Sequence, residues 1–425
     1  MKRSVTDPDD SDEGSGDATW TVPPDPSPSA PNGASGRGRR DMDGGGRASP
    51  HDSHHPVSAI IEKSVTPIPP LTQLYFYLTD GCNLACRHCW LAPRYVGSGD
   101  PGEVLPVDLF EQAVAEARPL GLERVKLTGG EPLLHPEIHK LLEIVRREAL
   151  ALVLETNGVL CTPEIAAAIA CIPNRSVAVS LDGARAETHE WVRNVPGSFE
   201  AACQGIRNLV AAGVSPQIIM TLVRKNASEV EEVAWLAEGL GASSVKFNLL
   251  HPLARGEMLH ASEKTLEVEE LIVLGRYVET DFSVRTPLRL YFDYPVAFRP
   301  LSRIASENGS GRCGILNILG VLCSGRYALC GIGEHVPGLV FGAVEKDDLA
   351  RVWREAPTLQ ALREGLPGRL SGVCQLCVMK AACLGSCIAQ NVYRKGDLWA
   401  PFWFCEEAYE KGCFPLSRLP ARVAA

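Results

Sequence analysis

Three cysteines with short gaps between them, Cys82, Cys86 and Cys89, follow the apolar stretch 74–78 in a C-x3-C-x2-C arrangement. Such gaps let one loop curl around a face of an iron–sulfur cubane with little cost of loop closure. Three thiolates on a cubane of four irons leave one iron without a protein ligand. A four-thiolate zinc site uses C-x2-C pairs instead, and the next cysteine is as distant as Cys161. The spacing therefore predicts a 4Fe-4S cluster with one open coordination position, where chemistry can occur.

The elements that must position this loop are visible as apolar runs of strand length that alternate with amphipathic, helix-like stretches. The strand-like runs are 74–78, 125–128, 151–155, 177–181, 217–223 and 245–250, and helical patterns cover 108–117, 138–147 and 227–239. Strands that alternate with helices indicate parallel βα units. No G-x-G-x-x-G follows the first strand, which argues against a dinucleotide-binding sheet. We therefore expect an α/β fold, an incomplete barrel of six such units, with ligands at the carboxyl ends of its strands.

The second predicted strand ends in a short run, Gly129-Gly130-Glu131-Pro132. Two glycines let the backbone approach a ligand closely, and Glu131 offers an acceptor for an ammonium group. A plain turn explains the same four residues equally well. Taken alone, the run leaves both interpretations open.

The cysteine loop, with Gly-Gly-Glu-Pro about forty residues later, resembles the signature of the radical S-adenosylmethionine (SAM) enzymes. This resemblance implies that the open iron binds the amino and carboxylate groups of SAM. It also implies that an electron from the reduced cluster cleaves SAM to a deoxyadenosyl radical. Gly129, Gly130 and Glu131 would then hold the amino group of SAM. His88 occupies the place of the aromatic residue that usually lies against the adenine in this family.

Polar residues at other predicted strand ends are further SAM contacts by the same resemblance. Asn157 follows the third strand and Ser180 ends the fourth, where it matches a contact to the ribose or carboxylate of SAM. Arg193 matches a partner of the carboxylate, and the segment 248–252 resembles one that flanks the adenine. Helix capping or turn formation explains each of these residues as well.

Eight more cysteines lie between Cys313 and Cys405, and seven of them resemble the SPASM domain. That domain extends radical SAM enzymes that mature ribosomally made peptides and proteins, and it holds two auxiliary 4Fe-4S clusters. By this resemblance, Cys313, Cys330 and Cys387 hold the first auxiliary cluster, and Cys374, Cys377, Cys383 and Cys405 hold the second. Cys323 is a candidate fourth ligand of the first cluster. Without it, that cluster would have an open iron able to bind a substrate atom.

Zinc binding and core packing are alternative roles for several cysteines of the chain. A zinc ribbon would use Cys374, Cys377, Cys383 and Cys387. We expect Cys161, Cys171 and Cys203, in or beside barrel helices, to be core thiols. Cys413 has no assigned role, since Cys405 matches the SPASM cysteine spacing better.

Length and composition set the organisation of the chain. Its 425 residues, 45% of them apolar, suffice for two packed units. We expect a disordered tail over 1–57, a radical SAM partial barrel over 71–290 and a SPASM auxiliary-cluster domain over 305–415. The tail is rich in Asp, Gly, Ser, Pro and Arg and cannot bury enough apolar surface to fold. The alternative for the tail is a docking arm that binds a metal through His51, Asp52, His54 and His55.

Charge and hydropathy exclude several classes of protein. The net charge of −9 and the pI near 5.7 argue against nucleic acid as a partner. No apolar run is long enough to span a membrane, and the N-terminus lacks the apolar core of a secretory signal. We therefore expect a cytoplasmic protein. Fifteen thiols in a reducing compartment indicate metal ligands rather than disulfides.

The sequence thus predicts a radical SAM/SPASM oxidoreductase that acts on a ribosomally synthesised precursor peptide. The radical would abstract hydrogen from a substrate carbon, an auxiliary cluster would accept the resulting electron, and a flavodoxin or ferredoxin would reduce the SAM-binding cluster. No catalytic side chain is assigned.

Three rival functions remain. An anaerobic sulfatase-type maturase would carry a carboxylate directly after the second SPASM cysteine, where this chain has Gly331; Asp293 and Glu334 are candidate substitutes. A haem-modifying SPASM enzyme shares the C-x3-C-x-H-C form of the cysteine loop. A non-enzymatic iron–sulfur scaffold or electron carrier would have no need of the segment Gly129 to Pro132.

Overall fold

Six parallel neighbouring strands form the centre of one twisted sheet in this computed structural model, which describes residues 68–97, 99–306 and 313–421. They are β1 (Gln73–Tyr77), β4 (Arg124–Thr128), β5 (Ala151–Thr156), β6 (Arg175–Ser180), β7 (Gln217–Thr221) and β8 (Ser244–Asn248). Each corresponds to one of the six strands predicted from the sequence, with ends that differ by a few residues. The predicted α/β fold with a parallel sheet is confirmed.

The alternation of side chains along these strands explains both the core and the cavity. On β4, Val125 and Leu127 are buried, whereas Lys126 and Thr128 are half-buried. The other central strands show the same period of two, and their apolar side chains face the helices. The intervening, more polar side chains therefore face the inside of the partial barrel.

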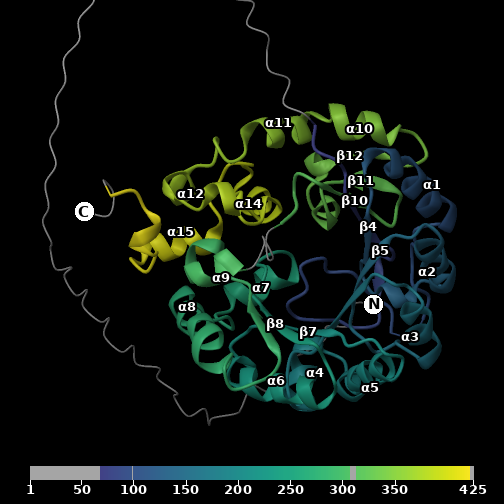
Figure 1. The fold of residues 1–425 in the computed structure, drawn as a ribbon, viewed down its shortest axis with the longest axis horizontal. Helices are drawn as coiled ribbons and strands as arrows, with labels where there is room; N and C mark the ends of the chain where they lie inside the picture. The colour runs from purple at the N-terminus through teal and green to yellow at the C-terminus, as the bar shows by residue number, and fades with distance from the viewer. Residues whose placement is uncertain (1–67, 98, 307–312, 422–425) are drawn as a thin grey trace, which may run out of the picture. The chain divides into compact units, whose positions relative to one another are not determined.

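Helices cover the outer face of these strands (Figure 1). The helices of the barrel region are α1 (Val107–Ala117), α2 (Ile138–Arg147), α3 (Pro163–Ala170), α4 (Ala186–Arg193), α5 (Ser198–Ala211), α6 (Val230–Gly239), α7 (Arg255–Ala261), α8 (Val268–Tyr277) and α9 (Leu301–Ser306). In α2, Ile138, Leu141, Leu142 and Val145 are buried at the helical spacing i, i+3, i+4 and i+7. Each such side chain contributes about 1.5–3 kcal/mol by its burial. The start of α3 is set by the Thr162 hydroxyl, which accepts a hydrogen bond from the Ile165 N–H at 3.3 Å.

The sheet continues beyond the six predicted strands at both edges. β9 (Arg289–Phe292) pairs in parallel with β8. At the other edge, β10 (Ile318–Val321) pairs in parallel with β1, and β11 (Arg326–Ala328) and β12 (Val340–Ala343) add antiparallel strands. The barrel is therefore an open sheet with β12 and β9 at its edges. Because β10–β12 belong to the predicted SPASM region, that region shares the sheet of the barrel, and residues 66–425 form one unit.

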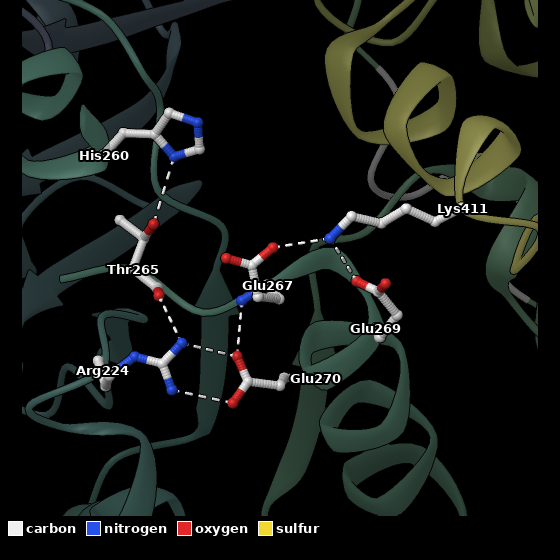
Figure 2. Close-up of polar contacts among 7 residues, drawn as sticks. All are labelled: Arg224, His260, Thr265, Glu267, Glu269, Glu270 and Lys411. Atoms are coloured by element: carbon white, nitrogen blue, oxygen red, sulfur yellow. Dashed lines mark hydrogen bonds and ion pairs between the residues drawn. The ribbon is translucent and has the colours of Figure 1, made fainter. Parts of the chain in front are cut away.

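The C-terminal part of the chain consists mainly of short helices. They are α10 (Leu349–Glu355), α11 (Pro357–Gly365), α12 (Gly372–Leu376), α13 (Lys380–Cys383), α14 (Ile388–Lys395) and α15 (Trp403–Glu410). Directly after α15, Lys411 binds Glu267 at 2.7 Å and Glu269 at 2.9 Å, at the start of α8 (Figure 2). These charges are partly exposed, so the contact contributes little to stability, about 0–1 kcal/mol.

Two expectations concern residues or boundaries that the structure leaves as predictions. The predicted tail 1–57, with His51, Asp52, His54 and His55, lies outside the described residues. The predicted barrel boundary at 290 falls within β9, the predicted SPASM boundary at 305 falls within α9, and both stay predictions. Within the described ranges, no helix has the length and apolar character needed to cross a membrane.

Candidate active site

The cysteine loop follows β1 at the carboxyl end of the sheet. Its first part, β2 (Gly81–Cys82), pairs with β3 (Arg94–Tyr95) and so closes the loop on itself. Cys82 and Cys86 are buried and Cys89 is half-buried. The predicted position of the three thiols at the ends of parallel strands agrees with the structure.

Hydrogen-bond donors surround the sulfurs of this loop. The Leu84 N–H donates to the Sγ atom of Cys82 at 3.4 Å, and Nη1 of Arg193 donates to the Sγ atom of Cys86 at 3.5 Å. Burial raises the pKa of both thiols when no metal is bound, and the guanidinium of Arg193 opposes this rise at Cys86. Clustered thiols that receive N–H donors fit an iron–sulfur cluster, whose potential such donors tune.

The two glycines after β4 let the adjacent segment pack against the cysteine loop. Gly129 has φ of 129°, which a side chain rarely tolerates, and a Cβ atom on Gly130 would lie 1.9 Å from the carbonyl oxygen of Gly81. The Glu131 N–H donates to that same carbonyl at 3.0 Å. Close packing between the two segments is thus one physical reason for both glycines.

The carboxylate of Glu131 is buried and accepts three hydrogen bonds. Its donors are the Thr156 hydroxyl at 2.6 Å, the Asn157 N–H at 2.8 Å and the Leu133 N–H at 3.1 Å. Burial raises the pKa of Glu131, and the three donors oppose that rise. The side-chain amide of Asn157 in turn donates to Oδ1 of Asn83 at 2.7 Å. Glu131 therefore ties the end of β5 to the cysteine loop.

A buried ion pair lies on the other side of the loop. Oδ2 of Asp182, after β6, is 2.6 Å from Nε of Arg193 and 3.2 Å from Nε2 of His88. Oδ1 accepts the Thr221 N–H at 2.8 Å. Burial alone would raise the pKa of Asp182, but Arg193 and His88 hold it well below its usual range. Asp182 thus positions Arg193 beside Cys86. The sequence pattern did not reveal this role of Asp182.

One cavity brings all these parts together. Cys82, Cys86 and Cys89 line it with every predicted SAM contact, which are His88, Gly129, Gly130, Glu131, Asn157, Ser180 and Arg193. Asn248 and His251 also line the cavity, and the sequence analysis named only the segment that contains them. It assigned no role to Trp90, Thr221 or Arg255, which line the cavity as well. Burial lowers the pKa of His251 to about 4, so this ring is neutral at neutral pH.

The cysteines after residue 312 form two groups. Cys313, Cys330 and Cys387 lie within electrostatic reach of one another. Cys374, Cys377, Cys383 and Cys405 line a second, apolar cavity together with Pro295, Leu370 and Phe414. These are the two sets that the SPASM resemblance implies, and their binding to clusters stays a prediction.

Cys323 lies apart from both groups. It occupies the turn between β10 and β11, and the charges that act on it are the carboxylates of Glu334, Glu103 and Asp80. A zinc ribbon would require Cys387 to join Cys374, yet Cys387 lies with Cys313. Among the described residues, no three His, Cys, Asp or Glu side chains converge closely enough to hold a single metal ion.

Two of the three expected core thiols are indeed in the core. Cys161 and Cys203 are buried. The prediction for Cys171 was wrong, because this residue caps the carboxyl end of α3 and is exposed.

Comparisons with known proteins agree with this geometry. The model of the radical SAM superfamily matches residues 76–237. An AdoMet-dependent heme synthase of Methanosarcina barkeri is 30% identical over 75% of this chain and 92% of that protein. A mycofactocin maturase, MftC, of Mycobacterium ulcerans is 29% identical over 79% of this chain and 88% of that protein. Among solved structures, Streptococcus suis SuiB bound to its precursor peptide SuiA has a TM-score of 0.64 at 18% identity, covering 80% and 76% of the two chains.

Proposed function

Since this chain belongs to the radical SAM superfamily, we propose that it modifies a ribosomally synthesised peptide with the aid of SAM. The observation that carries this proposal is one cavity lined by the cysteine loop, by the Gly129-Gly130 segment and by Arg193, which is paired with Asp182. When bound, the cluster and SAM supply a deoxyadenosyl radical. The side chains and backbone of the cavity hold the cluster and SAM in position.

The residues of the cavity have distinct parts in the proposal. Cys82, Cys86 and Cys89 hold the cluster. The backbone at Gly129 and Gly130 leaves room for the amino group of SAM, and Glu131 orders the adjacent strand ends. Arg193, aligned by Asp182, binds the carboxylate of SAM. His88, Asn157 and Ser180 complete the SAM site.

A peptide is the substrate favoured by the relatives. One is named a mycofactocin maturase, and the structure of SuiB contains a precursor peptide. The test is co-expression of this chain with the short peptide encoded nearest to its gene, followed by mass spectrometry of the peptide. A Cys82→Ala, Cys86→Ala, Cys89→Ala variant is expected to leave the mass unchanged, whereas Cys171→Ala, an exposed cysteine outside the cavity, is expected to modify the peptide as the unaltered chain does.

The two C-terminal cysteine groups are proposed to hold auxiliary clusters. Anaerobic reconstitution followed by iron, sulfide and zinc analysis is expected to give about twelve irons per chain, four for each of three cubanes. About four irons with bound zinc would refute this assignment. The apolar lining around Cys374, Cys377, Cys383 and Cys405 excludes water, a condition that lowers the dielectric around a buried cluster.

We propose Asp293 as the proton acceptor that acts after hydrogen has been abstracted from the substrate. Its carboxylate is 3.1 Å from Nζ of Lys246, and it acts electrostatically on both His251 and Cys387. Glu334 is a poorer candidate, because it acts on the separate thiol of Cys323, whereas Asp293 acts on His251 and Cys387.

Sulfatase-type maturation is disfavoured by packing around Gly331. A Cβ atom there would lie 2.4 Å from the ring of Tyr77 and 2.8 Å from Leu91, so a carboxylate side chain has no room. The carboxylate expected of that class therefore cannot be placed at this position without moving Tyr77.

Haem synthesis is the second candidate function, because the relative of that name is as similar to this chain as the maturase. The two functions are separated by giving the reduced, SAM-loaded protein either the peptide or an iron porphyrin that carries carboxylate side chains. Conversion of the porphyrin alone would overturn the peptide proposal. We further propose a flavodoxin or ferredoxin as electron donor, to be tested by SAM cleavage with each reduced protein.

A further inference from the structure

Arg255 is the first residue of α7 and lines the same cavity as the cysteine loop. Its Nε and Nη2 atoms are shielded from solvent. Neither atom has a hydrogen-bond partner among the described residues. Buried guanidinium nitrogens without partners are costly, so a site that keeps them indicates a group that binds there.

The other charged groups of the cavity already have partners of opposite charge or suitable donors. Arg193 is paired with Asp182 at 2.6 Å, and Glu155 is paired with Lys126 at 2.6 Å. Glu131 accepts three hydrogen bonds from its neighbours in the chain. Within the described ranges, no carboxylate that lines the cavity is therefore free to compensate Arg255.

Other arginines of the described chain also have buried nitrogens without a hydrogen-bond partner, but other interactions account for them. Arg193 forms the ion pair with Asp182, and Arg299 has a partner as well. Aromatic rings account for the remaining two. The guanidinium of Arg363 lies 4.3 Å from the ring centre of Trp353, and that of Arg394 lies 5.6 Å from the ring centre of Trp403. No such ring lies over Arg255 in the described residues. Arg255 differs from both in that it lines the cavity of the cysteine loop.

The backbone around Arg255 is fixed from two sides. Ala254 has φ of 49° and ψ of −120°, an unusual conformation for a residue with a side chain, and its N–H donates to the hydroxyl oxygen of Tyr393 at 3.4 Å. On the other side, a Cβ atom on Gly256 would lie 3.1 Å from the carbonyl oxygen of His88. The backbone that carries Arg255 is thus held between α14 and the cysteine loop before any ligand arrives.

We propose that Arg255 binds a carboxylate of the substrate, and so anchors the substrate beside the SAM site. The planar fork of a guanidinium suits a carboxylate, which can accept two parallel hydrogen bonds. This inference rests on the proposed function, in which Arg193 takes the carboxylate of SAM. Arg193 contacts Cys86, whereas no contact joins Arg255 to Cys82, Cys86 or Cys89 among the described residues.

The test measures binding rather than turnover. Anaerobically reconstituted, SAM-loaded full-length protein is titrated calorimetrically with N-acetylglycine, which has a carboxylate, and with the matched neutral probe N-acetylglycinamide. The unaltered protein is expected to bind the acid at least about tenfold more tightly than the amide, the usual size of a charge-assisted hydrogen bond. Arg255→Gln is expected to remove that preference while the Kd of SAM changes by less than about twofold.

Two further variants make the result specific. Arg255→Lys keeps the charge but loses the fork, and is expected to retain part of the preference. Arg394→Gln removes a guanidinium outside the cavity and is expected to behave as the unaltered protein does. Circular dichroism of each variant checks that it is folded.

Three results would overturn the inference. The first is equal binding of the acid and the amide by the unaltered protein, and the second is an acid preference that persists in Arg255→Gln. The third is that Arg255→Gln loses affinity for SAM and keeps its affinity for the acid. The last result would assign Arg255 to the carboxylate of SAM. Neither probe is turned over, so the binding test does not depend on activity. If the protein prefers the acid but leaves the co-expressed peptide unmodified, the proposed function is refuted and the carboxylate site at Arg255 is retained.

Discussion

Replacing Asp182 with Asn tests the electrostatic core of the site. This carboxylate is fully buried, and it compensates the guanidinium of Arg193 at 2.6 Å. Asparagine has nearly the same shape and can still accept the Thr221 N–H, which Oδ1 now accepts at 2.8 Å. The change therefore removes the charge of Asp182 with little change in packing.

The expected loss follows from leaving Arg193 buried and uncompensated. Breaking a buried ion pair by removing one partner costs about 3–5 kcal/mol in free energy of unfolding. Because the Thr221 hydrogen bond survives, we expect the lower end, about 3 kcal/mol. The double variant Asp182→Asn, Arg193→Gln removes both charges, and we expect it to be more stable than the sum of the two single losses predicts by about 2 kcal/mol or more.

Urea unfolding of cluster-free protein, followed by both circular dichroism and fluorescence, measures these differences at neutral pH. Coincident transitions by the two probes are required before free energies are derived. A loss below about 1 kcal/mol for Asp182→Asn would contradict the reasoning, since it would mean that water or another group compensates Arg193. Strict additivity in the double variant would contradict it as well.

Three further predictions concern protonation, catalysis and packing. Burial lowers the pKa of His189 to about 3, below the ordinary 6.5, so the unfolded chain binds more protons between these values and stability falls as pH drops. Between about pH 6.5 and 5 the expected loss in free energy of unfolding is about 1.6 kcal/mol. Urea unfolding at both pH values should show a smaller loss in His189→Gln. Asp293→Asn is expected to lower product formation about a hundredfold while 5′-deoxyadenosine still forms, as measured by chromatography; an equal fall of both would contradict its role as proton acceptor. Gly331→Ala is expected to cost about 1–3 kcal/mol by overpacking Tyr77, whereas Gly338→Ala, which meets no atom within 4 Å, should have almost no effect on the urea midpoint.

The sequence predicted the six central strands because their signal is local. Each strand lies in an apolar run of strand length, and Gly129 or Asn157 directly follows β4 or β5. β10 and β11 were not predicted from the sequence, and each has only three or four residues. β10 also depends on a partner far away in the chain, as Gln73 of β1 pairs with Ile318. Pairing over such a separation leaves no periodic trace in a single sequence.

The candidate site was predictable to the extent that motifs mark it. Spacing marked the cysteine loop, and a short run marked Gly129 and Gly130. Asp182 and Arg255 carry no such mark, because their importance comes from burial and from charges contributed by other strands and helices. The position of Cys323 likewise depends on the turn between β10 and β11, which the cysteine spacing does not encode.

The alternation that builds the barrel also separates its stability from its chemistry. Outward residues such as Leu127 and Phe247 are completely buried against the helices and supply the packing energy. Inward residues such as Ser180, Thr221 and Asn248 are half-buried at the cavity wall, where a change removes little apolar contact. The inner wall is therefore free to differ in polarity and charge without loss of the fold. An arginine whose buried nitrogens have no partner among the described residues, such as Arg255, is consequently better explained by what binds in the cavity than by what holds the sheet together.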